Sequence, residues 1–126
     1  MPTIITRTID AGGGGDYTTF TAAEAAVVTL VTTDDMVGND EAIVFECVAG
    51  TYNETVTVDS SSPGPALTMD ATRNITFKAA AGSEHDGTSS TGARLIFEDT
   101  GPGSIVLTDD FVTIDGLVCT TDTGAV

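Results

Sequence analysis

The sequence predicts an all-β fold, a short β-solenoid with one α-helix at its N-terminal end. Its 126 residues include 14 Gly, five Phe, two Tyr and no Trp, a composition that favours strands and turns over a helical bundle. Short β-branched segments separated by Gly, Pro, Ser and Asp clusters follow residue 42. Two-residue hairpin turns are nearly absent between them, which favours a solenoid over a β-sandwich, the alternative that these strands leave open.

The first element expected is a β-branched strand over residues 3–9. It ends at a glycine-rich loop, residues 12–15, whose backbone is free to adopt positive φ. A phosphate-binding loop is the functional alternative. The motif GxxxxGK[ST] is absent, no Lys is near, and Asp16 would repel a phosphate, so a plain connecting loop is the better interpretation.

One helix is expected, over residues 22–31. Thr21 and Glu24 have the spacing of a capping box, in which both side chains satisfy free N–H groups at the helix start. Ala23 and Val27 share an apolar face, so the helix should cover something hydrophobic. The acidic stretch that follows, residues 34–41, is expected to be a loop.

Strands separated by turns are expected over the rest of the chain. They are predicted at 42–48, 54–58, 66–69, 74–79, 94–98, 104–108, 111–114 and 116–120. The segments NITFKAA and FVTIDGL align at an offset of 37 residues, which suggests a repeat. We therefore expect a single domain, with residues 1–41 forming the N-terminal strand, loop and capping helix and residues 42–126 the β-helix coils.

Two patterns in these segments carry a resemblance to a known family. The first is G-x-Y-x-E-x-V-x-V over residues 50–58, and the second is V-x-I-x-G-L over residues 112–117. With the preceding strand and helix, they resemble the N-terminal cap and first coils of right-handed parallel β-helix proteins of the pectate-lyase-like superfamily, in the form found in phage and bacterial surface sequences. The resemblance implies a short right-handed parallel β-helix whose last coil needs a neighbouring molecule to cover it.

The net charge of the chain excludes binding to nucleic acid and to anionic membranes. Nineteen acidic and four basic residues give a net charge of −15 and a pI near 4.1. Such a chain is repelled by phosphate backbones and anionic membranes, so neither nucleic acid nor a membrane is an expected partner.

The N-terminus has no basic segment followed by an apolar stretch, so synthesis without a signal peptide is expected. Cys47 and Cys119 lie in apolar runs and are expected to be buried free thiols.

The acidic residues offer a candidate ion site. Carboxylate oxygens are the ligands that Ca²⁺ prefers, and one loop places four of them close in sequence: Asp34, Asp35, Asp40 and Glu41. The spacing does not match a known calcium loop, so a solvated loop is the alternative. A second candidate group is Asp109, Asp110 and Asp115.

No catalytic constellation is predicted. The family's enzymes imply acidic residues beside an Arg or Lys, but the four basic residues are better interpreted as surface groups: Arg7, Arg73, Lys78 and Arg94. The single histidine, His85, lies between Glu84 and Asp86 in a loop without a partner nucleophile in sequence. The chain is therefore not expected to be an enzyme.

These observations lead to an expected function. It is a non-enzymatic structural protein of a phage virion, a capsid decoration (cement) protein that docks on the shell and stabilises it. The expected partners are the major capsid protein or another virion protein and further copies of the chain, with an interface at Thr120, Thr121 and Val126. The alternatives are a tail-fibre or spike element, a truncated polysaccharide-lyase-like module and a glycan-binding adhesin module.

Overall fold

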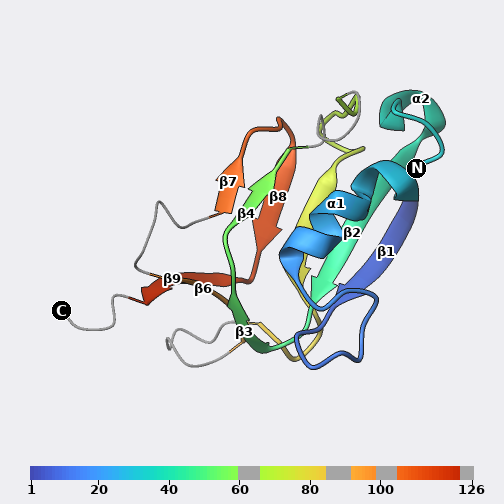
Figure 1. Ribbon diagram of the computed structural model, residues 1–126. Helices are drawn as coiled ribbons and strands as arrows, with labels where there is room; N and C mark the ends of the chain where they lie inside the picture. Colours follow the sequence, from blue (N-terminus) through green and yellow to red (C-terminus); the bar gives the residue numbers. More distant parts are fainter. Residues whose placement is uncertain (60–65, 85–91, 99–104, 123–126) are drawn as a thin grey trace.

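The computed structural model describes residues 1–59, 66–84, 92–98 and 105–122 (Figure 1). The helices are α1 (Phe20–Leu30) and α2 (Met36–Asn39). The strands are β1 (Thr3–Ile9), β2 (Glu41–Cys47), β3 (Gly50–Asn53), β4 (Val56–Val58), β5 (Ile75–Ala79), β6 (Ala93–Glu98), β7 (Ile105–Leu107), β8 (Val112–Asp115) and β9 (Val118–Asp122). Neither helix is long and apolar enough to cross a membrane, among the residues in these ranges.

All strand pairs within the described residues are parallel. The largest sheet has the order β1-β2-β5-β8, and two smaller sheets have the orders β3-β6-β9 and β4-β7. Parallel neighbours need a crossover connection, and α1 provides it between β1 and β2. In Figure 1, α1 lies in front of β1 and β2. It packs against β1 and β4, so it lies between the largest sheet and the smallest.

The predicted all-β fold is therefore wrong, and so is the predicted membership of the pectate-lyase-like β-helix superfamily. The architecture is α/β: a four-stranded parallel sheet that stays open, packed with helices, and not a β-solenoid. Short β-branched strands without hairpin turns are typical of any parallel sheet, because parallel strands are never joined by tight turns. The pattern therefore identified parallel pairing without determining how the sheet is covered.

The predicted 37-residue repeat is the register between two neighbouring strands. In β5 and β8, Ile75 lies opposite Val112 and Phe77 opposite Ile114. β2 continues the same rows, since Phe45 lies opposite Phe77. Like residues on one face of adjacent strands form continuous apolar rows, so the repeat reflects a core that is built from stacked equivalent positions.

Aromatic rings join α1 to the sheet. Phe20 lies edge-on to Tyr52, with ring centroids 4.9 Å apart, and stacks on Phe77 at 5.7 Å. Phe77 in turn stacks on Phe45 at 5.0 Å. All four side chains are at most 2% exposed. The helix therefore contributes to the main core, as its predicted apolar face required.

The start of α1 differs from the predicted capping box. The N-cap is Thr19, whose side chain accepts the Ala22 N–H, and the helix begins at Phe20. The carboxylate at the helix start comes from Glu54, which accepts the N–H groups of Phe20 at 2.9 Å and Thr21 at 2.7 Å. A carboxylate from a distant segment therefore takes the role predicted for Glu24.

Two other predicted segments differ in detail. The acidic loop 34–41 contains the single turn α2, capped by Asp35, whose Oδ1 accepts the Gly38 N–H at 2.8 Å. The predicted strand at 66–69 is reduced to one bridge between Thr68 and Asp35. The predicted strand at 54–58 is β4, preceded by the separate strand β3. Cys47 is a buried free thiol, as predicted.

Candidate functional site

The four predicted calcium ligands make separate contacts. Asp35 caps α2, and Glu41 accepts hydrogen bonds from the backbone and hydroxyl of Thr32. Asp40 pairs with Arg73, and the Asp34 carbonyl accepts the Thr68 N–H at 2.8 Å. In the described ranges, no three Asp, Glu, His or Cys side chains group in a way that could hold a metal ion. The calcium site stays a prediction.

Arg73 joins two acidic residues. Its Nε lies 2.8 Å from Asp40 Oδ1, and its Nη1 lies 2.9 Å from Asp70 Oδ2. Hydrogen bonds from the Thr72 and Arg73 N–H groups, with smaller contributions from their side chains, lower the pKa of Asp70 to about 2. The hydrogen bonds to Asp40 and Asp70 raise the pKa of Arg73. The geometry is that of an ion pair that fixes the start of β5.

Lys78 is exposed between two acidic residues on the outer face of the sheet. The parallel register places Glu46 of β2 and Asp115 of β8 opposite Lys78 of β5. Opposite charges in directly opposed positions stabilise neighbouring strands modestly. Asp115 is thereby part of the sheet surface, whereas Asp109 and Asp110 lie in the preceding turn.

The remaining predicted residues are placed only in part. Thr120 and Thr121 lie in β9, the terminal strand of its sheet, opposite residues 96 and 97 of β6. His85 and Val126 lie outside the described residues. The interface that was predicted from Thr120, Thr121 and Val126 stays a prediction.

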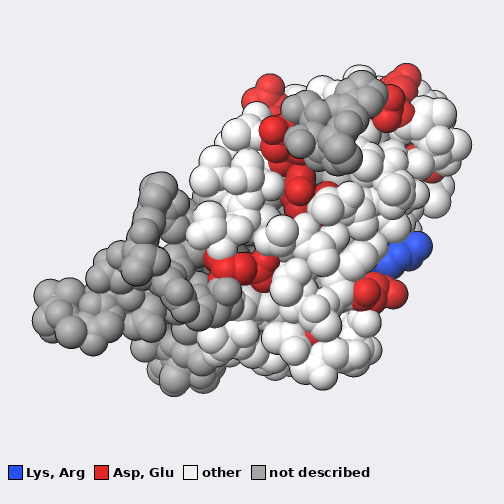
Figure 2. All heavy atoms as spheres, in the orientation of Figure 1, with Lys and Arg blue, Asp and Glu red and all other residues white. Residues whose placement is uncertain are grey.

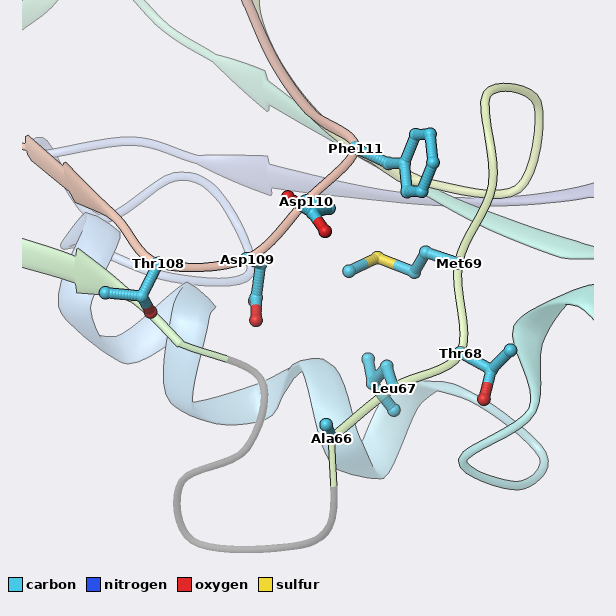
Figure 3. A pocket seen from close by; sticks show the side chains of 8 residues that line it. All are labelled: Ala66, Leu67, Thr68, Met69, Thr108, Asp109, Asp110 and Phe111. Atoms are coloured by element: carbon cyan, nitrogen blue, oxygen red, sulfur yellow. The ribbon is translucent and has the colours of Figure 1, made fainter.

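A cavity of about 370 Å³ lies between two connections, and sequence analysis did not predict it. One wall is the segment after β4, and the other is the turn between β7 and β8. The lining residues are Ala66, Leu67, Thr68, Met69, Thr108, Asp109, Asp110 and Phe111. Figure 3 shows Leu67 and Met69 pointing from one wall into the space towards Asp109 and Asp110 on the other. This volume is within the range of small-ligand sites.

Backbone hydrogen bonds hold both walls in place. The Thr108 N–H and hydroxyl both donate to the carbonyl of Val58, at 3.1 and 3.0 Å. On the other wall, the Thr68 N–H donates to the Asp34 carbonyl. Val58 belongs to a core strand and is 1% exposed. The cavity is therefore supported by ordered elements on both sides.

The surroundings of the cavity are acidic. Partial burial raises the pKa of Glu24, and the nearby Asp109 and Asp59 carboxylates raise it further against the lowering effect of the Asp59 N–H bond. In the face drawn in Figure 2, Asp and Glu side chains form a broken band, while Lys and Arg are seen in one place only. The potential at this surface therefore favours cations.

Apolar side chains are exposed beside the cavity. Val106, Leu107 and Phe111 are 40%, 44% and 50% exposed, and Phe111 has a φ of 61° that bulky residues rarely adopt. Strand β8, at the edge of its sheet, adds the half-buried Val112 and Ile114. We call this region the open end: Val106, Leu107, Phe111 and strand β8.

Two sequence signals point to this region in retrospect. Phe111 directly follows Asp109 and Asp110, an unusual position for a strand-forming aromatic residue, and Leu67 and Met69 alternate in a segment too short for a full strand. Neither signal shows that the two segments, about 40 residues apart in sequence, face each other. The pairing of β4 with β7, which precede the two walls, and of β5 with β8, which follow them, brings the walls together.

Comparison with known proteins identifies no relative of this chain. No family model, no curated protein and no solved structure matches it.

Proposed function

We propose that the chain is a non-enzymatic structural protein that assembles through its open end. The supporting observation is the exposure of Val106 and Leu107 on β7, beside an edge strand with half-buried Val112 and Ile114. Exposed apolar groups next to unpaired strand edges are typical of association surfaces. A capsid decoration protein of a phage is the version of this role that the sequence predicts.

The first occupant that we propose for the open end is a second copy of the chain. An edge strand is complementary to itself, because two β8 edges can pair antiparallel about a twofold axis. The resulting contact also brings the apolar side chains of both copies together. Each copy carries a net charge of −15, so association should strengthen when salt screens the repulsion.

Sedimentation velocity tests this proposal. We expect the mass of the protein to shift from monomer towards dimer as NaCl is raised from about 0.02 M to about 0.5 M. Leu107→Lys places a charge in the apolar contact and should remove the dimer at both salt concentrations.

The matched control is Ile4→Lys. Ile4 is 52% exposed on β1, the opposite edge strand of the largest sheet, and this variant has the same net charge as Leu107→Lys. It should associate like the parent protein. A parent protein that remains monomeric at about 1 mM, or equal losses in the two variants, would contradict assembly through the open end.

A further inference from the structure

The cavity beside the open end combines an apolar wall with acidic groups. Leu67 and Met69 form the apolar wall, and Phe111 lies at one side of the space with half of its surface exposed. Asp109 and Asp110 lie across from Met69, with Asp110 the more exposed of the two. A ligand that matches this lining has an alkyl stem and a cationic head.

Arginine and lysine side chains have this form. Their methylene groups pack on apolar surface while the charged head stays near water or a carboxylate. A guanidinium group can also stack on the face of an aromatic ring, as Phe111 would allow. The acidic surroundings, which include Asp59 and Glu24, attract such a group and repel an anion.

We propose that this cavity binds an arginine or lysine side chain of a basic protein partner. The inference rests on the proposed function, because it concerns the contact of a decoration protein with the shell protein and not the contact between two copies, and it names the chemistry of that partner. The side chain enters between Met69 and Phe111, and its head lies at Asp109 and Asp110. Binding of this kind weakens as salt rises, whereas pairing of two copies strengthens with salt.

Methionine methyl groups provide a direct readout. The chain contains three methionines: Met69 lines the cavity, Met36 is fully buried in the core, and Met1 is the exposed N-terminus. With ¹³C-methyl methionine, N-acetyl-arginine amide at low salt should shift the Met69 resonance saturably. Met36 and Met1 should not move with the same titration curve. The affinity of one side chain should be in the millimolar range, of order 1 mM.

Two matched controls separate this site from general attraction to an acidic protein. N-acetyl-citrulline amide keeps the shape of the arginine probe without its charge and should give no saturable shift. Asp110→Asn should weaken the arginine probe about threefold to fivefold. Glu46→Gln removes one charge from the outer face of β2, outside the open end, and should leave the affinity unchanged.

The outcomes are distinct from those of the association test. Shifts of Met1 and Met69 that remain linear in probe concentration, or equal effects of Asp110→Asn and Glu46→Gln, would overturn the inference. A saturable shift with the free diamine putrescine but none with the arginine probe would also overturn it, because the cavity would then take a small cation. Assembly of the parent protein can fail or succeed independently, since it is read at high salt from Leu107→Lys.

Discussion

The two edge strands of the four-stranded sheet, β1 and β8, differ in how the rest of the chain covers them. At β1, the glycine-rich loop turns back on the strand: the Asp16 and Tyr17 N–H groups donate to the Thr8 carbonyl, and the Asp16 carboxylate accepts the Thr8 N–H. The approach is close, since a Cβ on Gly15 would lie 2.8 Å from the Thr8 carbonyl oxygen. At β8, no described strand pairs with the outer edge. The last residues of β1 are thus protected by their own chain, whereas the outer edge of β8 is available to a partner.

Burial falls from the middle of the sheet towards the β8 edge. Ile75 and Phe77 on β5 are fully buried, whereas Val112 and Ile114, their register partners on β8, are half-buried. The residue types are equally apolar, so the difference comes from coverage and not from composition. The central strand β5 therefore contributes to the core that holds the fold together, and the open end retains apolar surface for binding.

The largest expected effect contrasts two phenylalanines. Phe20→Ala in α1 should lower the free energy of unfolding by about 3–5 kcal/mol, because removal of a 1% exposed ring leaves a cavity against Tyr52 and Phe77. Phe111→Ala at the open end should change it by less than about 0.5 kcal/mol, since Phe111 is half exposed. Urea unfolding measures both. Similar losses of stability in the two variants would contradict the contrast between the buried core around Phe20 and the open end around Phe111.

The carboxylate at the start of α1 should have the next largest effect. Glu54→Gln removes the charge that accepts two backbone N–H groups, so we expect a loss of about 1–2 kcal/mol in urea unfolding. Glu46→Gln, on the outer face of β2, removes one charge without a helix contact and should cost less than about 0.5 kcal/mol. Equal losses of stability in Glu54→Gln and Glu46→Gln would mean that the change in net charge, and not the contact with the start of α1, is responsible.

The protected edge should depend on Asp16. Asp16→Ala exposes the Thr8 N–H and should cost about 0.5–1.5 kcal/mol, because one backbone hydrogen bond is lost. Asp16→Asn keeps an acceptor and should retain most of that stability. If both variants unfold like the parent protein, the loop protects β1 only through its backbone bonds.

The smallest effect is a dependence on pH. The pKa of Asp70 is lowered to about 2 in the folded state, so its stabilisation is present above its ordinary pKa, 3.8, and is lost as pH falls from there through about 2. The pKa of Glu24 is raised, so its contribution has the opposite sign and is lost as pH rises through the raised pKa.

Urea midpoints between pH about 5 and 2 measure this difference. Asp70→Asn should flatten the acid side of the profile, whereas Glu24→Gln should make it steeper. A profile that Asp70→Asn leaves unchanged would show that the hydrogen bonds from Thr72 and Arg73 do not persist in solution.

The sequence predicted the strand boundaries better than it predicted the contacts between distant segments. β1, β2 and β5 begin and end within a residue or two of the predicted strands, because their β-branched runs stop at turn residues. The predicted repeat marked a true strand register. Contacts between distant segments have no local signal: Glu54 reaches Thr21 across 33 residues, and Arg73 reaches Asp40 across the same separation.

The prediction of the fold class was wrong for a related reason. Whether parallel strands remain an open sheet with a helix against it depends on where α1 packs, and its apolar face does not specify that surface. The cavity was missed because its walls are distant in sequence and meet through strand pairings, β4 with β7 before them and β5 with β8 after them. Individual acidic residues at Asp109 and Asp110 were recognised, but the apolar wall opposite them was not.

The contact between Glu54 and α1 has a consequence for the order of events during synthesis. An 11-residue helix is only marginally stable alone, and this one emerges from the ribosome more than 20 residues before the carboxylate that completes its first turn. The ring of Tyr52, which packs on Phe20, arrives equally late. We therefore expect the N-terminal segment to gain these contacts only after residues 52 to 54 have been translated.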